Sequence, residues 1–457
     1  MSASNPEISP LIRELSEYIA GAIKAPLPAD VQIRAKVHIV DTVSAMISGS
    51  RLLPGKKAIS YIKSIGGKPE AIVMGTKIRT SAANAALANG MLAHADETDD
   101  THPPSRTHPG SCVVPAALAI GERAGLSGTA VLRSIVLGYD VCARMLLAID
   151  ELYFRGTGHF ASSFGGIFGA AAAAGALLKF DALKVRYMLS YTGQLASGLQ
   201  NTVRDIEHIQ KAFAGGGLGA HNGTVAALMV AQGFTGVEDV FSGERDFFFT
   251  FAPEANRALL TRGLGRDYEI MQCGIKRWPA GGPIQAPLQI LGELMKQHGF
   301  GAQDVESLAV RMPDNEHATV NNRKMPDICV QHLLAVMLLD GAMTFKSAHD
   351  TARMQDPKVL AVRKRIEAIP DPKLTDLLRR WRCVMDVALK DGRKFTHQTM
   401  AAKGTSEAPL TPVEEEEKAL DLIAPILGTR RAKTLLATLW DFEHIKNVRS
   451  LRNLVSR

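Results

Sequence analysis

Apolar residues recur at helical spacing along most of this 457-residue chain. The spacing predicts a helix over residues 8–25 and another over 31–50, for which Asp30 is a candidate N-cap. After a less regular stretch at 66–80, it predicts further helices over residues 82–92, 112–124, 128–147, 165–178, 182–199 and 223–232. Alanine and glycine dominate many of these segments, and such small side chains let helix axes approach closely. We therefore expect a dense bundle of helices packed on one another.

The pattern changes near Gly274. Apolar and polar residues alternate over 305–312, 384–390 and 394–400, which is typical of strands, and Asp391-Gly392 joins the last two as a hairpin turn. Residues 330–339 predict a helix that ends before Gly341. We therefore expect a smaller α+β region here. Helical spacing then returns, and Thr411 and Glu414 form a capping-box pattern at its start.

Length, charge and cysteine content limit the class of protein. The chain is longer than one hydrophobic core usually grows, so we expect two domains. Its 53 basic and 46 acidic residues give a net charge of +7, which suits anionic ligands but is too mild to indicate a nucleic-acid partner. The five cysteines lie far apart. Their spacing argues against a disulfide framework, a zinc site and an iron–sulfur cluster, and it favours a reducing cytoplasm.

An uncharged run over residues 160–178 approaches the length that spans a bilayer. Because the run is rich in serine, glycine and alanine, we interpret it as a tightly packed interior helix. Residues 1–10 contain neither the basic nor the apolar region of a secretory signal. We therefore expect no membrane partner and a cytoplasmic location.

Polar residues interrupt the apolar helices in three places. The first is residues 94–108, where four acids and three histidines lie close together. A metal site and a solvated loop are alternative interpretations, but the segment matches neither an EF-hand nor an H-E-x-x-H pattern. Since it lies between an alanine-rich helix and a second apolar helix, we favour a functional site.

The second place is His159, which precedes a glycine-rich helix. The positive end of that helix dipole would favour a bound carboxylate and lower the pKa of the imidazole. The third is Lys211, which precedes a glycine-rich turn over 215–219 that could bind an anion through backbone N–H groups. Alone, His159 would more often be a structural residue and Lys211 a surface residue.

Taken in order, these motifs resemble the MmgE/PrpD family. The resemblance rests on H-A-x-x-x-D-D-T-H at 94–102, H-P-G at 108–110, G-Y-D-V at 138–141, the lysine before a Gly/Ala helix, K-R-W-P at 276–279 and D-G-R at 391–393. It covers nearly the whole chain. It implies a mainly α fold in which residues 1–268 and 402–457 form a large helical domain and residues 269–401 form a smaller α+β lid domain. It also implies a homodimer and catalysis without a metal or other cofactor, in a cleft between the domains.

The same resemblance assigns roles to particular residues. By position, the family's active-site residues fall on Glu97, Thr101, His108, His159 and Lys211. The family's reactions share a proton transfer at a carbon next to a carboxylate, which requires a base near its working pKa and cations that hold the carboxylates. We expect His159 or His108 as general base or acid, Lys211 as carboxylate clamp or proton carrier, and Thr101 as a hydrogen-bond partner of a substrate oxygen. The substrate-binding candidates are Lys276, Arg277, Asp100, His102 and Gln285.

Three positions depart from the family pattern. Ala280 replaces a usual cysteine, Gln285 a common histidine, and Thr319 stands where the decarboxylases have a tyrosine. These departures disfavour a cis-aconitate decarboxylase and weaken the case for 2-methylcitrate itself. The expected reaction is elimination of water from a hydroxylated di- or tricarboxylate, as in 2-methylcitrate dehydratase. The alternatives are an epimerase or isomerase of a dicarboxylate, like iminodisuccinate epimerase, and a non-catalytic carboxylate-binding homologue.

Overall fold

The computed structural model describes residues 8–376 and 381–457 and divides into two compact units. The first unit comprises residues 1–95, 99–273 and 422–457, and the second comprises residues 96–98 and 274–421. The predicted domain boundaries lie at 268/269 and 401/402, whereas the units change at 273/274 and 421/422. The division into a core domain and a lid domain stays a prediction.

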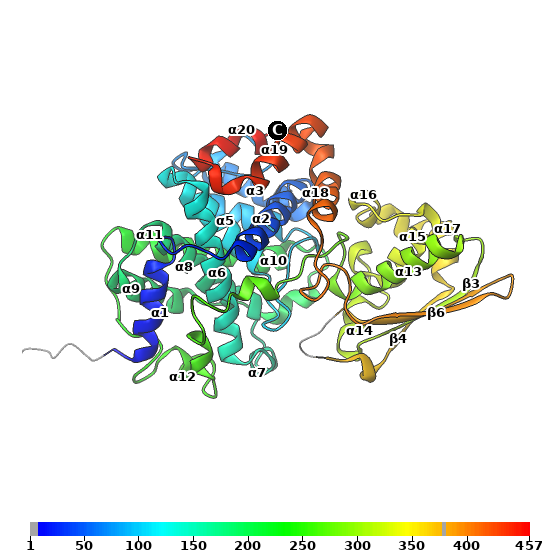
Figure 1. Cartoon of the computed structure of the whole chain (residues 1–457), viewed down its shortest axis with the longest axis horizontal. Helices are drawn as coiled ribbons and strands as arrows, with labels where there is room; N and C mark the ends of the chain where they lie inside the picture. The colour runs from blue at the N-terminus through cyan, green and yellow to red at the C-terminus, as the bar shows by residue number, and fades with distance from the viewer. Residues whose placement is uncertain (1–7, 377–380) are drawn as a thin grey trace, which may run out of the picture. The chain divides into compact units, whose positions relative to one another are not determined.

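The first unit is a bundle of helices around α8 (Ala161–Leu177). Every residue of α8 is buried, and it packs against α5 (Pro109–Ala124), α6 (Gly128–Ile149) and α11 (Leu218–Ala231) (Figure 1). The interior-helix interpretation of residues 160–178 is therefore confirmed. Among the described residues, no helix combines the length and the apolar character needed to cross a membrane. The other helices are α1 (Pro10–Gly21), α2 (Ala29–Gly49), α3 (Leu53–Ile65), α4 (Ala82–Ala93), α7 (Glu151–Gly156), α9 (Ala182–Leu195), α10 (Ile209–Ala212), α12 (Phe247–Phe251), α19 (Thr429–Trp440) and α20 (Arg452–Val455).

Glycine permits the close approach of α8 and α11. A Cβ atom on Gly223 would lie 2.6 Å from the backbone nitrogen of Ala171 and 2.6 Å from the carbonyl oxygen of Ile167. Backbone atoms of a buried helix cannot move aside as a flexible side chain can, so a larger residue here must separate the two helices.

We expect Gly223→Ala to lower the free energy of unfolding by about 1–3 kcal/mol, the usual cost of overpacking a close-packed interior. Urea denaturation of the full chain measures this change. Gly21→Ala is the matched control, because a Cβ at Gly21 has no neighbour within 4 Å. Equal unfolding midpoints for the two variants would contradict the packing argument.

The second unit is built on a four-stranded sheet with the order β4-β3-β5-β6. Strand β3 (Val305–Met312) pairs in parallel with β4 (Ile366–Pro370) and antiparallel with β5 (Cys383–Leu389), which forms a hairpin with β6 (Lys394–Thr399). Helices α13 (Gln285–His298) and α15 (Val330–Asp340) pack against the sheet and against each other (Figure 1). The remaining helices are α14 (Asp314–Val320), α16 (Phe345–Ala348) and α17 (Pro357–Arg363), with α18 (Pro412–Leu427) running on into the first unit. The predicted mainly α fold with a small α+β part is confirmed.

Most local predictions agree with the structure, including the capping box, and three features differ. The capping box is present, because the Glu414 backbone N–H donates to the Thr411 hydroxyl and the Thr411 N–H donates to the Glu414 carboxylate. Asp30 is not the N-cap of α2: Pro28 occupies that position and Asp30 lies in the first turn. The irregular stretch at 66–80 contains a short antiparallel pair, β1 (Ala71–Ile72) and β2 (Arg79–Thr80), and strand β4 was not predicted.

Candidate active site

Two helix ends bring histidines together in the first unit. Helix α4 ends with His94 as its C-cap, α5 begins with His108 as its N-cap, and the two helices pack against each other. All residues from His94 to Thr101 are buried, as is His102. The solvated-loop interpretation of this segment is therefore wrong, because its acidic side chains lie inside the protein.

Asp99 links the two imidazoles. Its Oδ2 atom lies 2.7 Å from His94 Nδ1 and 3.4 Å from His108 Nδ1. The His94 ring lies 5.0 Å from the His108 ring and 5.7 Å from that of His208, measured between centroids. A carboxylate that holds imidazoles in this way fixes their orientation. One buried carboxylate thus pairs with two imidazoles, and the His208 ring packs against one of them.

The contacts of His108 identify its proton-carrying nitrogen. Nδ1 lies 2.6 Å from the carbonyl oxygen of Asp100, which can only accept, so Nδ1 carries the hydrogen. In the neutral ring Nε2 is therefore the atom that can take up a proton. The backbone N–H of His108 donates to the Ser162 hydroxyl at 3.1 Å, which places the start of α5 beside the start of α8.

The same reasoning applies to His159. The Thr157 hydroxyl donates its one hydrogen to the carbonyl of Phe154, so it must accept the 2.7 Å hydrogen bond from His159 Nδ1. The ring stacks on Phe154 with 4.4 Å between centroids, and Phe164 packs edge-on against it. Burial lowers the pKa of His159 by desolvation; this is the direction predicted from the sequence, but the cause is not the predicted helix dipole. Nε2 is left as the basic nitrogen.

Lys211 has a different setting from the predicted glycine-rich anion-binding turn. It lies in α10, directly before a π-helical segment η2 (Phe213–Gly217) that continues into α11. The glycines are buried in this helix: a Cβ on Gly216 would lie 2.0 Å from the carbonyl oxygen of Gly90 in α4. The glycines therefore serve close helix packing. Residues 215–219 are helical, so the predicted anion-binding turn is wrong. The half-buried Lys211 remains a candidate, and its backbone N–H donates to Asp205.

A second group of predicted residues lies in the second unit. The buried ammonium group of Lys276 lies 3.5 Å from the carboxylate of Glu97, and both side chains are almost inaccessible. Arg277 packs over the ring of Trp278 and lies 3.7 Å from Glu414. The predicted acid and the predicted carboxylate-binding lysine are thus brought together as an ion pair.

His349 was not predicted and completes this group. Its Nε2 lies 3.0 Å from Asp96, and its Nδ1 lies 2.8 Å from the carbonyl oxygen of Phe345. Burial opposes protonation, but the hydrogen bond and the charge of Asp96 outweigh it and raise the pKa of His349 to about 9. Asp96 also accepts hydrogen bonds from the backbone and hydroxyl of Thr98, while Lys418 donates to the Thr98 carbonyl. Cationic side chains therefore hold the three-residue segment that carries Glu97.

This ion pair predicts a loss of stability at alkaline pH. The pKa of His349 is raised above its ordinary value of 6.5, so the pair contributes fully below about pH 6.5 and its contribution falls as the pH rises through about 9. The whole shift corresponds to about 3 kcal/mol. Urea denaturation at pH 6.5 and pH 10 measures the difference, with His349→Gln as the control that lacks this dependence. A wild-type chain with the same pH dependence as that variant would contradict the assignment.

Four other predicted side chains are engaged within the protein. The Thr101 hydroxyl donates to the Thr107 carbonyl, and the buried carboxylate of Asp100 accepts three hydrogen bonds. His102 accepts from the Ser105 N–H and lies 3.3 Å from Glu269, while Gln285 bonds to the backbone of Trp278 and Ala280. Because these bonds use the polar atoms of Asp100, His102 and Gln285 inside the protein, we assign these three residues no contact with a substrate.

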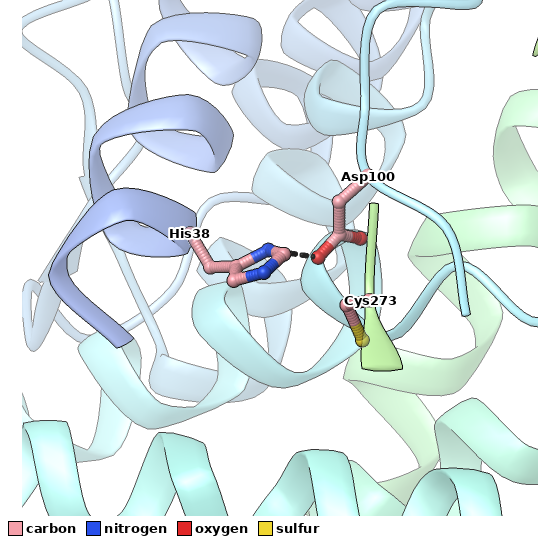
Figure 2. Close-up of side chains that lie close together, drawn as sticks. All are labelled: His38, Asp100 and Cys273. Carbon is pink, nitrogen blue, oxygen red and sulfur yellow. Dashed lines mark hydrogen bonds and ion pairs between the residues drawn. The ribbon is translucent and has the colours of Figure 1, made fainter. Parts of the chain in front are cut away.

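Among the residues that the structure describes, two groups of side chains could hold a metal ion. The ligand atoms of His94, Asp99 and His108 lie within 4.8 Å of one another, and the same is true of His38, Asp100 and Cys273 (Figure 2). Burial raises the pKa of the Cys273 thiol well above its ordinary value, which disfavours the thiolate that a metal requires. In both groups the carboxylate bonds directly to an imidazole nitrogen.

Models of one protein family match most of this chain. Residues 13–259 match the family model of the MmgE/PrpD N-terminal domain, and residues 278–442 match that of the MmgE/PrpD C-terminal domain. The chain is 25% identical to human cis-aconitate decarboxylase over 97% of its length and 95% of that protein. It is 26% identical to the cis-aconitate decarboxylase-like protein oryM of Aspergillus oryzae over 62% of its length and 61% of that protein. The cis-aconitate decarboxylase of Aspergillus terreus is 22% identical over 65% of the chain and 62% of that protein.

Proposed function

Because the chain belongs to the MmgE/PrpD family, we propose that it is a lyase that removes a proton next to a carboxylate and eliminates water from a hydroxylated di- or tricarboxylate. The observation that carries this proposal is the pairing of Asp99 with His94 and His108. A buried carboxylate that orients two imidazoles is suited to general acid–base catalysis. The relatives named above bear the name of a lyase of a tricarboxylate, which supports the substrate class.

The roles below combine the family resemblance with the contacts of each side chain. The Nε2 atom of His108 takes the proton from the carbon next to the carboxylate, and His159 delivers a proton to the departing hydroxyl group. Lys211 binds a substrate carboxylate, and the Thr101 oxygen, whose own hydrogen is donated to the Thr107 carbonyl, accepts a hydrogen bond from a substrate hydroxyl group. Lys276 remains a candidate for substrate binding from the family resemblance alone. Glu97 forms an ion pair with Lys276 in the second unit.

Incubation with 2-methylcitrate, citrate, cis-aconitate and iminodisuccinate in D2O tests the proposal. We expect an absorbing alkene product from a hydroxylated tricarboxylate. Deuterium wash-in without elimination would instead indicate the epimerase, and binding without exchange on any of the four compounds would indicate a non-catalytic binder. We also expect activity to survive EDTA; a reversible loss would show that a metal takes part.

Decarboxylation is the second candidate, because the relatives named above include the human and Aspergillus terreus cis-aconitate decarboxylases. Thr319, which stands where the resemblance places a decarboxylase tyrosine, argues against it: its hydroxyl donates to the Glu316 carbonyl within its own helix. Release of carbon dioxide from cis-aconitate, followed by NMR of the product, would favour this candidate over the dehydratase.

We further propose that the chain forms a homodimer in the cytoplasm. Leu199, Val203 and Ile206 are 64%, 58% and 76% exposed on one segment of the first unit, which is unusual for apolar side chains so close together. Light scattering on the purified chain tests the dimer. We expect twice the monomer mass, and Ile206→Lys to lower it.

A further inference from the structure

Asp100 lies at the centre of a buried hydrogen-bond network in the first unit. Its Oδ2 atom accepts from His38 Nδ1 at 2.7 Å and from the Tyr139 hydroxyl at 2.6 Å. Its Oδ1 atom accepts from the backbone N–H of Gly110 at 3.0 Å. Figure 2 shows the His38 ring directed at the carboxylate, with the Cys273 thiol close by. Three donors from three different helices therefore hold one carboxylate.

The network keeps Asp100 ionised although no part of its side chain reaches solvent. Burial alone would raise the pKa of Asp100, but hydrogen bonds from His38 and Tyr139 outweigh it and lower the pKa. The carboxylate also lies at the N-terminus of α5, a 16-residue helix whose dipole favours negative charge there. Burial raises the pKa of Tyr139 well above its ordinary value, so this side chain remains a donor.

The backbone of Asp100 makes the second link. Its carbonyl oxygen accepts the 2.6 Å hydrogen bond from His108 Nδ1. The side chain thus fixes Gly110, two residues after the histidine, and the main chain fixes the imidazole itself. We propose that Asp100 is a positioning residue, which holds His108 in the Nδ1–H form with Nε2 directed to the reaction. Its role in turnover rests on the proposed function of His108; the hydrogen-bond arrangement does not.

Close packing supports this role. A Cβ atom on Gly110 would lie 2.6 Å from the Thr42 hydroxyl and 2.8 Å from both Asp100 Oδ1 and the Tyr139 hydroxyl. Only glycine allows the start of α5 to lie directly on the network, so a shift of the carboxylate must move the backbone next to His108. Such small displacements matter, because a misplacement of about 1 Å can cost about 10²-fold in rate.

Tyr139→Phe is the test, because it removes one hydroxyl and preserves the ring. The matched control is Tyr18→Phe, which removes another hydroxyl that donates to a buried aspartate of the same unit, Asp140, at 2.6 Å. Two quantities are measured on the full chain: kcat and KM with the turned-over polycarboxylate, and the tautomer of His108 by long-range 1H–15N NMR of ¹⁵N-histidine-labelled protein, assigned with His108→Gln.

We expect wild-type protein and Tyr18→Phe to show the Nδ1–H tautomer at His108. Tyr139→Phe should show a mixture of tautomers and a kcat about 10-fold lower, with little change in KM. Both variants should lose similar thermal stability, so a merely structural role predicts equal kcat values. Wild-type tautomer and kcat in Tyr139→Phe would overturn the inference. So would one equivalent of tightly bound zinc that disappears in His38→Gln, since the network would then be a metal site.

The two readouts separate this inference from the proposed function. A changed tautomer with unchanged kcat would support the positioning of His108 by Asp100 and remove His108 from catalysis. An unchanged tautomer in Tyr139→Phe, together with a large loss of kcat in His108→Gln, would support the proposed function and overturn the inference.

Discussion

Replacing His108 with glutamine is expected to lower kcat by about 10³-fold, within the range that general acid–base groups contribute. Glutamine can still donate to the Asp100 carbonyl, as Nδ1 of the imidazole does, but it cannot take up a proton. The fold should therefore persist while the chemical step slows, and KM should change little. Steady-state kinetics with the turned-over polycarboxylate measure both quantities.

The control for this variant is His444→Gln. His444 is an exposed histidine of the first unit that pairs with Asp441 at the surface, so its loss should leave kcat unchanged. If His108→Gln retained turnover within about 3-fold of the wild type, general acid–base catalysis at this position would be refuted.

His159→Ala is expected to lower kcat by about 10²-fold or more. The imidazole is held by Thr157 and stacked on Phe154, with Phe164 edge-on against it, so its orientation is fixed and Nε2 is the atom left to transfer a proton. Burial lowers the pKa of His159 below the ordinary value of 6.5. The ionisation of this residue in the pH dependence of kcat/KM, which reports the free enzyme, should therefore lie below pH 6.5 and disappear in the variant. Near-normal turnover by His159→Ala would remove it from the mechanism.

Much of the fold followed from short-range patterns in the sequence. Strand β3 and the hairpin around Asp391-Gly392 were predicted because alternation and turn chemistry act between neighbouring residues. Strand β4 was missed because it is five residues long, ends at Pro370, and depends on a parallel pairing with β3 that leaves no local signal. The strand exists through tertiary contacts.

For the candidate site, the sequence likewise predicted the local features and missed the long-range pairings. The acidic, histidine-rich segment marked the right region, but the sequence could not show that Asp99 rather than Glu97 joins His94 to His108. His38 carried no signal at all, since it is a single histidine in an apolar helix 62 residues from Asp100. His349 likewise meets Asp96 from a distant segment. Pairings of this kind are set by helix packing, which periodicity does not encode.

The reassignment of Asp100 follows from its surroundings. A carboxylate in a histidine-rich motif was predicted to bind substrate, yet its oxygens accept three hydrogen bonds and lie out of contact with solvent. A carboxylate whose oxygens already accept hydrogen bonds in the interior acts on a substrate through the residues that it positions.

The most direct test of the central claim compares wild-type protein with His108→Gln during incubation with 2-methylcitrate, citrate, cis-aconitate and iminodisuccinate in D2O, followed by proton NMR. The account predicts that the wild type converts at least one hydroxylated tricarboxylate to an alkene. It also predicts that His108→Gln binds the same compound and forms product about 10³-fold more slowly. Binding of these compounds by the wild type with neither deuterium exchange nor elimination would contradict the account.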